Sequence, residues 1–151
     1  MFVLYLVIPC YNEQEVLPET SKQLLEKMNS LINKGKISDK SRIVLVDDGS
    51  RDETWKIIEK LHEDNPLFQG IKLSRNRGHQ NALLAGLMTA KDYCDIAISL
   101  DADLQDDINA IDEMVDKHHD GCDIVYGVRS ARKTDTIFKR TTAEGFYKLM
   151  K

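Results

Sequence analysis

Short apolar runs and longer amphipathic segments alternate along the whole chain. The runs are typical of buried strands, and the segments between them carry apolar residues at helical spacing. The runs predict five strands, at residues 2–9, 42–46, 68–73, 96–100 and 123–127. The segments predict helices at residues 16–33, 54–64, 80–90 and 107–119, and a last amphipathic segment at 137–151.

This alternation predicts an α/β fold, with a Rossmann-like, mostly parallel sheet flanked by helices. Residues 2–9 are almost entirely apolar, which is typical of a central strand covered on both faces. No long polar linker and no internal repeat interrupts the pattern. We therefore expect residues 1–151 to form a single domain with a core of its own.

Polar clusters follow the ends of four predicted strands. They are Tyr11-Asn12-Glu13, Asp47-Asp48, residues 75–79 and residues 101–106. In parallel α/β sheets, ligands bind beyond the carboxyl ends of the strands. The general polarity of loops would not select one edge of the sheet over the other, so the clusters predict a functional site at this edge.

The bulk properties exclude several classes of protein. The net charge is -4, so no overall basic field points to a nucleic-acid partner. The chain has no GxGxxG after the first strand and no GxxxxGK[ST], which argues against dinucleotide oxidoreductases and P-loop enzymes. The first apolar run is too short to span a bilayer and lacks the features of a signal peptide, and we expect no transmembrane helix within these residues.

The three cysteines, Cys10, Cys94 and Cys122, lie in or beside apolar runs. Their positions favour buried free thiols in a reducing compartment over disulfides. A zinc site at His118, His119 and Cys122 is disfavoured, because no second ligand pair has matching spacing.

The acidic stretch after the fourth strand is the main candidate for chemistry. Asp101, Asp103 and Gln105 alternate, so their side chains would point the same way if the chain stays extended. Such oxygen ligands suit a hard cation, Mg2+ or Mn2+, whose charge would offset the repulsion between the carboxylates. The alternative is a plain acidic loop.

The other clusters each have a functional and a simpler interpretation. Tyr11 could stack on a nucleobase and Glu13 could accept from a ribose hydroxyl, or the segment is a turn with a capping Asn. One of Asp47 and Asp48 could accept from a pyrimidine N–H while the other caps a helix, or they form an Asp-Gly turn. Residues 75–81 suit an anion at a helix start, or form a solvated loop. The late basic residues could bind phosphate or a membrane surface, or could line a solvated helix face: Arg129, Arg132, Lys133, Lys139 and Arg140.

Taken together, these segments resemble glycosyltransferase family 2, the inverting enzymes of the GT-A fold. The matches are Val7-Ile8-Pro9-Cys10-Tyr11-Asn12-Glu13, Val46-Asp47-Asp48-Gly49-Ser50 with Asp52 and Thr54, and Asp101-Ala102-Asp103. The chain also resembles the branch that glycosylates polyprenyl phosphates, as do dolichol-phosphate mannose synthase and undecaprenyl-phosphate glucosyltransferase. That likeness lies in Asn76-Arg77-Gly78-His79-Gln80-Asn81-Ala82-Leu83, in Leu104-Gln105-Asp106 and in Gly127-Val128-Arg129-Ser130-Ala131-Arg132.

The resemblance implies a role for each matching residue. A nucleotide would be held by Pro9, Tyr11, Glu13, Asp47, Asp48 and Arg77. Asp101, Asp103 and Gln105 would hold Mg2+ or Mn2+ with the diphosphate, and Asp101, Asp103 and Asp106 would be the catalytic carboxylates. The acceptor phosphate would meet Arg129, Arg132, Lys139 and Arg140.

The implied reaction moves a sugar from a nucleotide sugar, UDP-linked in preference to GDP-linked, to a lipid phosphate. The alternatives are transfer to a saccharide or other hydroxyl, for which Asp106 would be the candidate base, and a nucleotide-sugar-binding module without turnover. Two departures from the family stand out. Asp106 is followed by Asp107-Ile108-Asn109 where that branch usually has Pro-Pro-Glu. The family also continues into membrane-associated helices, so we expect a truncated C-terminal side and a longer protein at the cytoplasmic face of the membrane.

Overall fold

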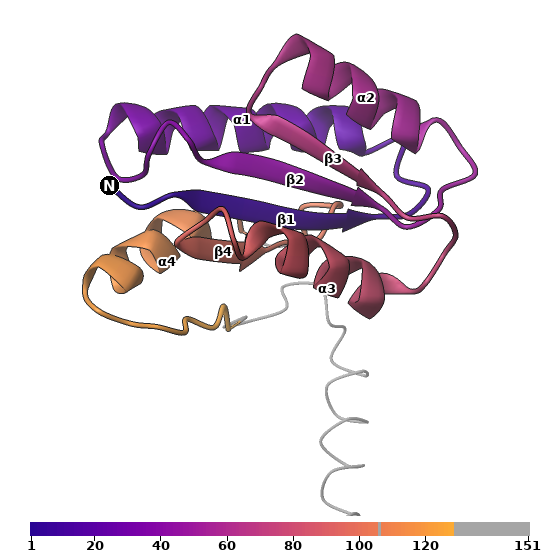
Figure 1. The fold of residues 1–151 in the computed structure, drawn as a ribbon. Coiled ribbons are helices and arrows are strands. Elements are labelled where there is room, and N and C mark those ends of the chain that lie inside the picture. Colours follow the sequence, from indigo (N-terminus) through magenta and orange to yellow (C-terminus); the bar gives the residue numbers. More distant parts are fainter. Residues whose placement is uncertain (106, 129–151) are drawn as a thin grey trace, which may run out of the picture.

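Four parallel strands form one sheet in the order β3-β2-β1-β4 (Figure 1). The computed structural model describes residues 1–105 and 107–128. The strands are β1 (Leu4–Cys10), β2 (Arg42–Asp47), β3 (Phe68–Lys72) and β4 (Ile96–Ser99). The helices are α1 (Leu17–Asn33), α2 (Thr54–Asp64), α3 (His79–Ala90) and α4 (Ala110–His119). The predicted alternation of strands and helices is confirmed over this part of the chain, and the predicted bounds of α2 coincide with the observed ones.

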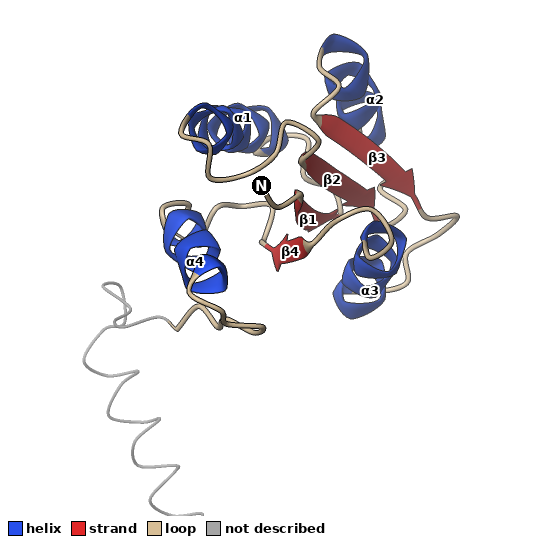
Figure 2. Cartoon of the chain, turned by 60° about the vertical axis from the view of Figure 1, so that its left-hand side comes forward, coloured by secondary structure: helices blue, strands red, loops and turns tan. Residues whose placement is uncertain are grey.

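Helices cover both faces of the sheet (Figure 2). On one face α1, α2 and α4 pack on a core that includes Leu6, Ile8 and Leu45. On the other face α3 packs on Val7, Val44 and Val46 through its small buried residues. Strand β1 supplies side chains to both cores, which explains why its sequence is apolar at successive positions rather than at alternate ones.

The order of the strands creates a topological switch between β1 and β4. The chain builds outward from β1 through β2 to β3, and then crosses the sheet through α3 to add β4 on the other side of β1. All four strands are parallel, so the loops after them meet at one edge. In open α/β sheets the crevice at such a switch is the usual ligand site. The loops that flank it here begin at Tyr11 and Leu100.

The prediction of a fifth strand at residues 123–127 is wrong. The segment is irregular, and its alternate apolar residues Ile124, Tyr126 and Val128 are 72%, 82% and 85% exposed. A strand depends on its neighbours for hydrogen bonds and burial, and β4 is the edge strand among the described residues. Between that edge, α4 and this segment lies a cavity of about 730 Å³.

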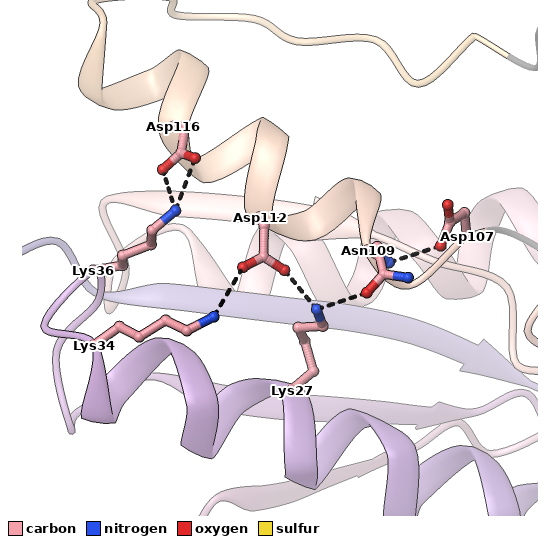
Figure 3. Close-up of polar contacts among 7 residues, drawn as sticks. All are labelled: Lys27, Lys34, Lys36, Asp107, Asn109, Asp112 and Asp116. Carbon is pink, nitrogen blue, oxygen red and sulfur yellow. Dashed lines mark hydrogen bonds and ion pairs between the residues drawn. The ribbon is translucent and has the colours of Figure 1, made fainter.

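Ion pairs fasten α4 to α1 and to the turn that follows α1 (Figure 3). Lys27 of α1 contacts Asp112 at 2.5 Å and Asn109 Oδ1 at 3.1 Å. Lys36 contacts Asp116 at 2.6 Å, and Lys34 lies 3.9 Å from Asp112. The position of α4 is therefore set by α1 as well as by the apolar core.

Cys10 is buried and Cys94 is half-buried, but Cys122 is exposed, so the expectation of a buried thiol is wrong at Cys122. Cys122 lies outside the core because the segment around it does not join the sheet. Within residues 1–105 and 107–128, no helix is both long and apolar enough to cross a membrane.

Candidate functional site

The loops after β1 and β2 are joined side by side at the carboxyl edge. Five hydrogen bonds between side chains and backbone amides connect them. They run from Asn12 N to Ser50 Oγ (2.9 Å), Arg51 N to Asn12 Oδ1 (2.9 Å), Glu13 N to Thr54 Oγ1 (2.8 Å), Gln14 N to Asp52 Oδ2 (3.2 Å) and Glu53 N to Gln14 Oε1 (3.0 Å). The polar residues that follow both strands thus serve first to fix the loops to each other.

Asp48 fixes the loop after β3 to the same assembly. Its carboxylate is buried, and its two oxygens accept the backbone amides of Arg77 at 2.7 Å and Gly78 at 3.0 Å. Two of the backbone amides at the predicted anion site before α3 therefore already bind a carboxylate of the protein itself, that of Asp48. With both oxygens engaged, Asp48 positions the loop that carries Arg77, whose side chain is exposed.

Asp47 differs from its neighbour in one respect. Its Oδ1 accepts the amide of Ser50 at 3.2 Å, whereas its Oδ2 is buried and has no hydrogen-bond partner among the described residues. A buried acceptor without a donor is costly, and such atoms in folded proteins call for an explanation. Of the two adjacent carboxylates, Asp47 is therefore the one with an oxygen that accepts no hydrogen bond from the described residues.

Charge concentrates where the loops after β1 and β4 face each other. Partial burial raises the pKa of Glu13 above its ordinary value, and the negative charges of Asp103 and Asp52 raise it further. Glu13 follows β1 and Asp103 follows β4, so the two sides of the topological switch bring carboxylates within electrostatic reach of each other. Burial, with Glu13 and Asp47 nearby, also raises the pKa of the Cys10 thiol, which therefore stays protonated.

The acidic loop turns sharply after β4. Strand β4 ends at Ser99, residues 102 and 103 form a turn, and Leu104 has a positive φ of 51°. Asp103 Oδ1 accepts the backbone amide of Gln105 at 3.2 Å, which closes the turn locally. The expectation that the chain stays extended here is wrong, so strand alternation does not bring Asp101, Asp103 and Gln105 together.

The carboxylates of the loop are nonetheless accessible. Asp101 is about half exposed, and its Oδ1 lies 3.7 Å from Nε2 of His79, the first residue of α3. Asp103 and Gln105 are exposed as well. The structure places the loop after β4 next to the start of α3, as the shared edge predicts.

The donors at this edge fit a hard divalent cation. Carboxylate and amide oxygens are the ligands that Mg2+ and Mn2+ prefer. Within the described residues no group of three or more His, Cys, Asp or Glu side chains is assembled for a metal. Two aspartates with oxygens from a bound diphosphate are a sufficient set, because Mg2+ is commonly held by one or two carboxylates and substrate phosphates.

Five predicted site residues lie outside the described part of the chain: Asp106, Arg129, Arg132, Lys139 and Arg140. Within the described part, two contacts to the acidic loop were not foreseen from the sequence. His79 contacts Asp101, and Thr20 of α1 donates a hydrogen bond to the carbonyl of Ala102. The position of His79 in the segment 76–83 was a signal for the first contact, whereas no local pattern marks the second.

The sequence profile described as Glycosyl transferase family 2 matches residues 5–150. The chain belongs to this family. A relative from Bacillus subtilis (strain 168), "Uncharacterized glycosyltransferase YkoT", is 56% identical over 98% of this chain and 44% of its own length. Another from Escherichia coli (strain K12), "Prophage bactoprenol glucosyl transferase homolog", is 40% identical over 95% of this chain and 44% of its own length.

Among solved structures, the mannosyltransferase PcManGT from Pyrobaculum calidifontis, in complex with GDP-Man and Mn2+, is similar to this family 2 chain. The TM-score is 0.51 at 25% identity, over 68% of this chain and 28% of that chain. The predicted GT-A fold and glycosyltransferase family are thereby confirmed. The chain spans less than half the length of the curated relatives, 44% in both cases above.

Proposed function

We propose that the protein binds a nucleotide sugar at the carboxyl edge and transfers the sugar, with inversion, to a polyprenyl phosphate. One observation carries this proposal: the loops on the two sides of the switch between β1 and β4, which carry Glu13 and the pair Asp101 and Asp103, lie at the edge that also holds the buried acceptor of Asp47. The name of the Escherichia coli relative, a bactoprenol glucosyl transferase homolog, supports a lipid phosphate as acceptor.

The nucleoside would occupy the loops after β1 and β2. Oδ2 of Asp47 would accept an N–H of the base, which supplies the missing donor of a buried carboxylate. The ring of Tyr11 is 41% exposed and can lie against the base, beside Pro9, and Glu13 can accept from the ribose. Uracil and guanine each present one ring N–H that would suit this oxygen, but guanine adds an exocyclic amino group that would need a second acceptor, and the other oxygen of Asp47 already accepts the amide of Ser50. A UDP-sugar is therefore favoured over a GDP-sugar.

The diphosphate would lie over the acidic loop. Asp101 and Asp103, with Gln105, would hold Mg2+ or Mn2+ there, and His79 adjoins the same carboxylates. The bound ion would neutralise charge that builds up on the leaving nucleoside diphosphate. The similar PcManGT structure, which is in complex with GDP-Man and Mn2+, supports a divalent ion as cofactor.

The attacking atom would be an oxygen of the lipid phosphate. It forms a bond to C1 of the sugar as the bond from C1 to the diphosphate oxygen breaks, and the electron pair of that bond leaves with the nucleoside diphosphate. Attack from the opposite face inverts C1. A phosphate is already ionised near neutral pH, so no strong base is required. Arg129, Arg132, Lys139 and Arg140 would meet the acceptor phosphate, at the cytoplasmic face of the membrane.

A hydroxyl acceptor on a saccharide is the second candidate. It would require a base to remove its proton, and Asp106 is the nearest carboxylate in the sequence to the metal aspartates. Nucleotide-sugar binding without turnover is the third candidate.

Nucleotide binding is the first test. Titration calorimetry with UDP and with GDP, each with and without Mn2+, should show binding that depends on Mn2+. We expect Asp103→Ala to weaken it by more than the roughly 10- to 100-fold that loss of an outer group costs, because a direct metal ligand is removed. Asp64→Ala is the matched control, since Asp64 ends α2 at the opposite edge of the sheet and should bind as the unchanged protein does. If Asp103→Ala binds the nucleotide with Mn2+ as tightly as the unchanged protein does, Asp103 is not a metal ligand.

The acceptor is tested separately by release of nucleoside diphosphate from a panel of UDP- and GDP-sugars. Release with undecaprenyl phosphate and not with saccharides supports the first candidate, and the reverse supports the second. Binding without release from any pair supports the third.

A further inference from the structure

The acidic loop after β4 is anchored by a buried side chain from the start of α1. Thr20 lies in the first turn of α1 and is 2% exposed. Its Oγ1 donates a hydrogen bond of 2.6 Å to the backbone carbonyl of Ala102, 82 residues away in the sequence. Ala102 is itself 4% exposed and packs in the core between the sheet and α1.

The hydroxyl of Thr20 is not used in the usual local way. Ser and Thr side chains inside helices commonly bond to a carbonyl three or four residues earlier. The next residue, Ser21, is equally buried and does so, with Oγ donating to the carbonyl of Pro18 at 3.0 Å. A hydroxyl has one proton to donate, so the proton of Thr20 is committed to the acidic loop instead.

The anchored residue stands between the two metal-site aspartates. Asp101 and Asp103 are exposed, whereas Ala102 between them is buried. Within the described residues, the bond from Thr20 is the hydrogen bond that reaches the backbone of residues 101–105 from another element. The positive φ of Leu104 shows that the loop departs from strand geometry directly after this point. Both carboxylates therefore project from a backbone segment whose position is fixed by α1.

We propose that Thr20 is a positioning residue for the divalent-metal site. Its hydroxyl holds the carbonyl of Ala102, and this fixes the direction in which Asp101 and Asp103 present their carboxylates to the metal and diphosphate. The inference rests on the proposed function, because it takes these aspartates as the metal ligands. Outer groups that orient metal ligands typically contribute roughly 10- to 100-fold in affinity or activity.

The test uses Thr20→Val, which keeps the shape and removes the hydroxyl, and Thr20→Ser, which restores the hydroxyl. Ser21→Ala is the matched control, because it removes an equally buried hydroxyl from the same helix turn. Mn2+ affinity is measured by electron paramagnetic resonance, with and without UDP, alongside thermal unfolding of each variant. We expect Thr20→Val to weaken Mn2+ binding by about tenfold or more, Thr20→Ser to recover it, and Ser21→Ala to leave it unchanged.

Wild-type affinity in Thr20→Val overturns the role of Thr20 and leaves the proposed function standing. An equal loss in Thr20→Val and Ser21→Ala, following their losses in thermal stability, also overturns it, because the effect is then general packing. Should Thr20→Val fail to fold, Thr20→Ala replaces it against Thr20→Ser. Absence of Mn2+ binding by the unchanged protein, with UDP present, overturns the metal site of the proposed function and this inference with it.

Discussion

The two sides of the topological switch are built differently. On one side, the loops after β1, β2 and β3 are joined by hydrogen bonds between side chains and backbone amides, and buried Asp48 accepts two of them. On the other side, the hydrogen bond from Thr20 fixes the acidic loop after β4 within the described residues. Helix α4 follows this loop and is held by the ion pair between Lys27 and Asp112. The loops of the first side are thus fixed to one another before a ligand binds. The second side is a charged loop that one buried hydrogen bond connects to another element within the described residues.

This difference matches the chemistry that we propose for each side. A nucleoside is recognised by fixed donors and acceptors, and loops that are fixed before binding lose less conformational entropy when it binds. The acidic loop would have to bring the carboxylates of Asp101 and Asp103 together at one cation. The charge of that cation would offset the repulsion between the two carboxylates. We therefore expect damage to the first side to lower the stability of the fold, and damage to the second to lower ligand binding.

The largest expected effect is at Gly49, in the turn after β2. Its φ is +70°, and a Cβ there would lie 2.5 Å from the backbone nitrogen of Asn76. We expect Gly49→Ala to lower the free energy of unfolding by roughly 3 kcal/mol, from backbone strain and from the clash between the two loops. Denaturant unfolding measures it. Gly35→Ala is the control, because Gly35 has a φ of +67° with no atom within 4 Å, and its loss should be about 1 kcal/mol. Equal losses at the two sites would mean that the loop contact contributes nothing.

The second effect is at Asp48. Asp48→Asn replaces one acceptor oxygen by a donor that faces a backbone amide, so we expect a loss of about 2 kcal/mol in the free energy of unfolding. Asp52→Asn offers a comparison, since Asp52 also accepts two backbone amides, from Gln14 and Thr54, but is half-buried. Its loss should be smaller. A larger loss at Asp52 than at Asp48 would contradict the expectation that the more deeply buried pair of hydrogen bonds costs more to disrupt.

The third effect concerns the tie between α1 and α4. Lys27→Met removes the partner of Asp112 at a partly buried site, and we expect a loss of about 1 kcal/mol with faster amide hydrogen exchange in α4. Lys56→Met removes an exposed pair with Glu53, which solvent screens, and should leave stability almost unchanged. Unchanged exchange in α4 of Lys27→Met would show that the apolar core alone holds this helix.

The smallest effect depends on pH. Burial acts to raise the pKa of Asp112, but its hydrogen bond to Lys27 and the charges of Lys27, Lys34 and Lys36 outweigh it and lower the pKa below its ordinary value. A carboxylate whose pKa is lowered in the folded state stabilises the protein above about pH 4, its ordinary pKa. This stabilisation is lost as the pH falls through the lowered pKa. The stability difference between wild type and Asp112→Asn should therefore be constant from pH 7 to about 5 and shrink below about pH 4. A difference that grows on acidification would reverse the sign of the assignment.

Most of the fold could be predicted because its signals are local. Apolar runs and helical spacing marked all eight described elements, and the parallel arrangement followed from their alternation. The strand predicted at 123–127 failed because β-propensity needs a neighbour to pair with, and sequence pattern does not supply one. Likewise, residues 101–105 do not follow the extended course that would align their side chains. Leu104 has a positive φ, and the sequence gives no sign of it because no glycine stands at that position.

What the sequence by itself determined is the edge at which the polar clusters lie, since in a parallel sheet the carboxyl ends of all strands must meet. It also determined the donor types there, carboxylates and an amide. Only the tertiary structure decided how these groups divide their work: Asp48 binds the protein, its neighbour Asp47 keeps a buried oxygen without a donor among the described residues, and Thr20 reaches Ala102 across 82 residues. The physical reason is that hydrogen-bond partners and burial are set by proximity in space. The sequence does not indicate which of two adjacent aspartates will have both oxygens hydrogen-bonded.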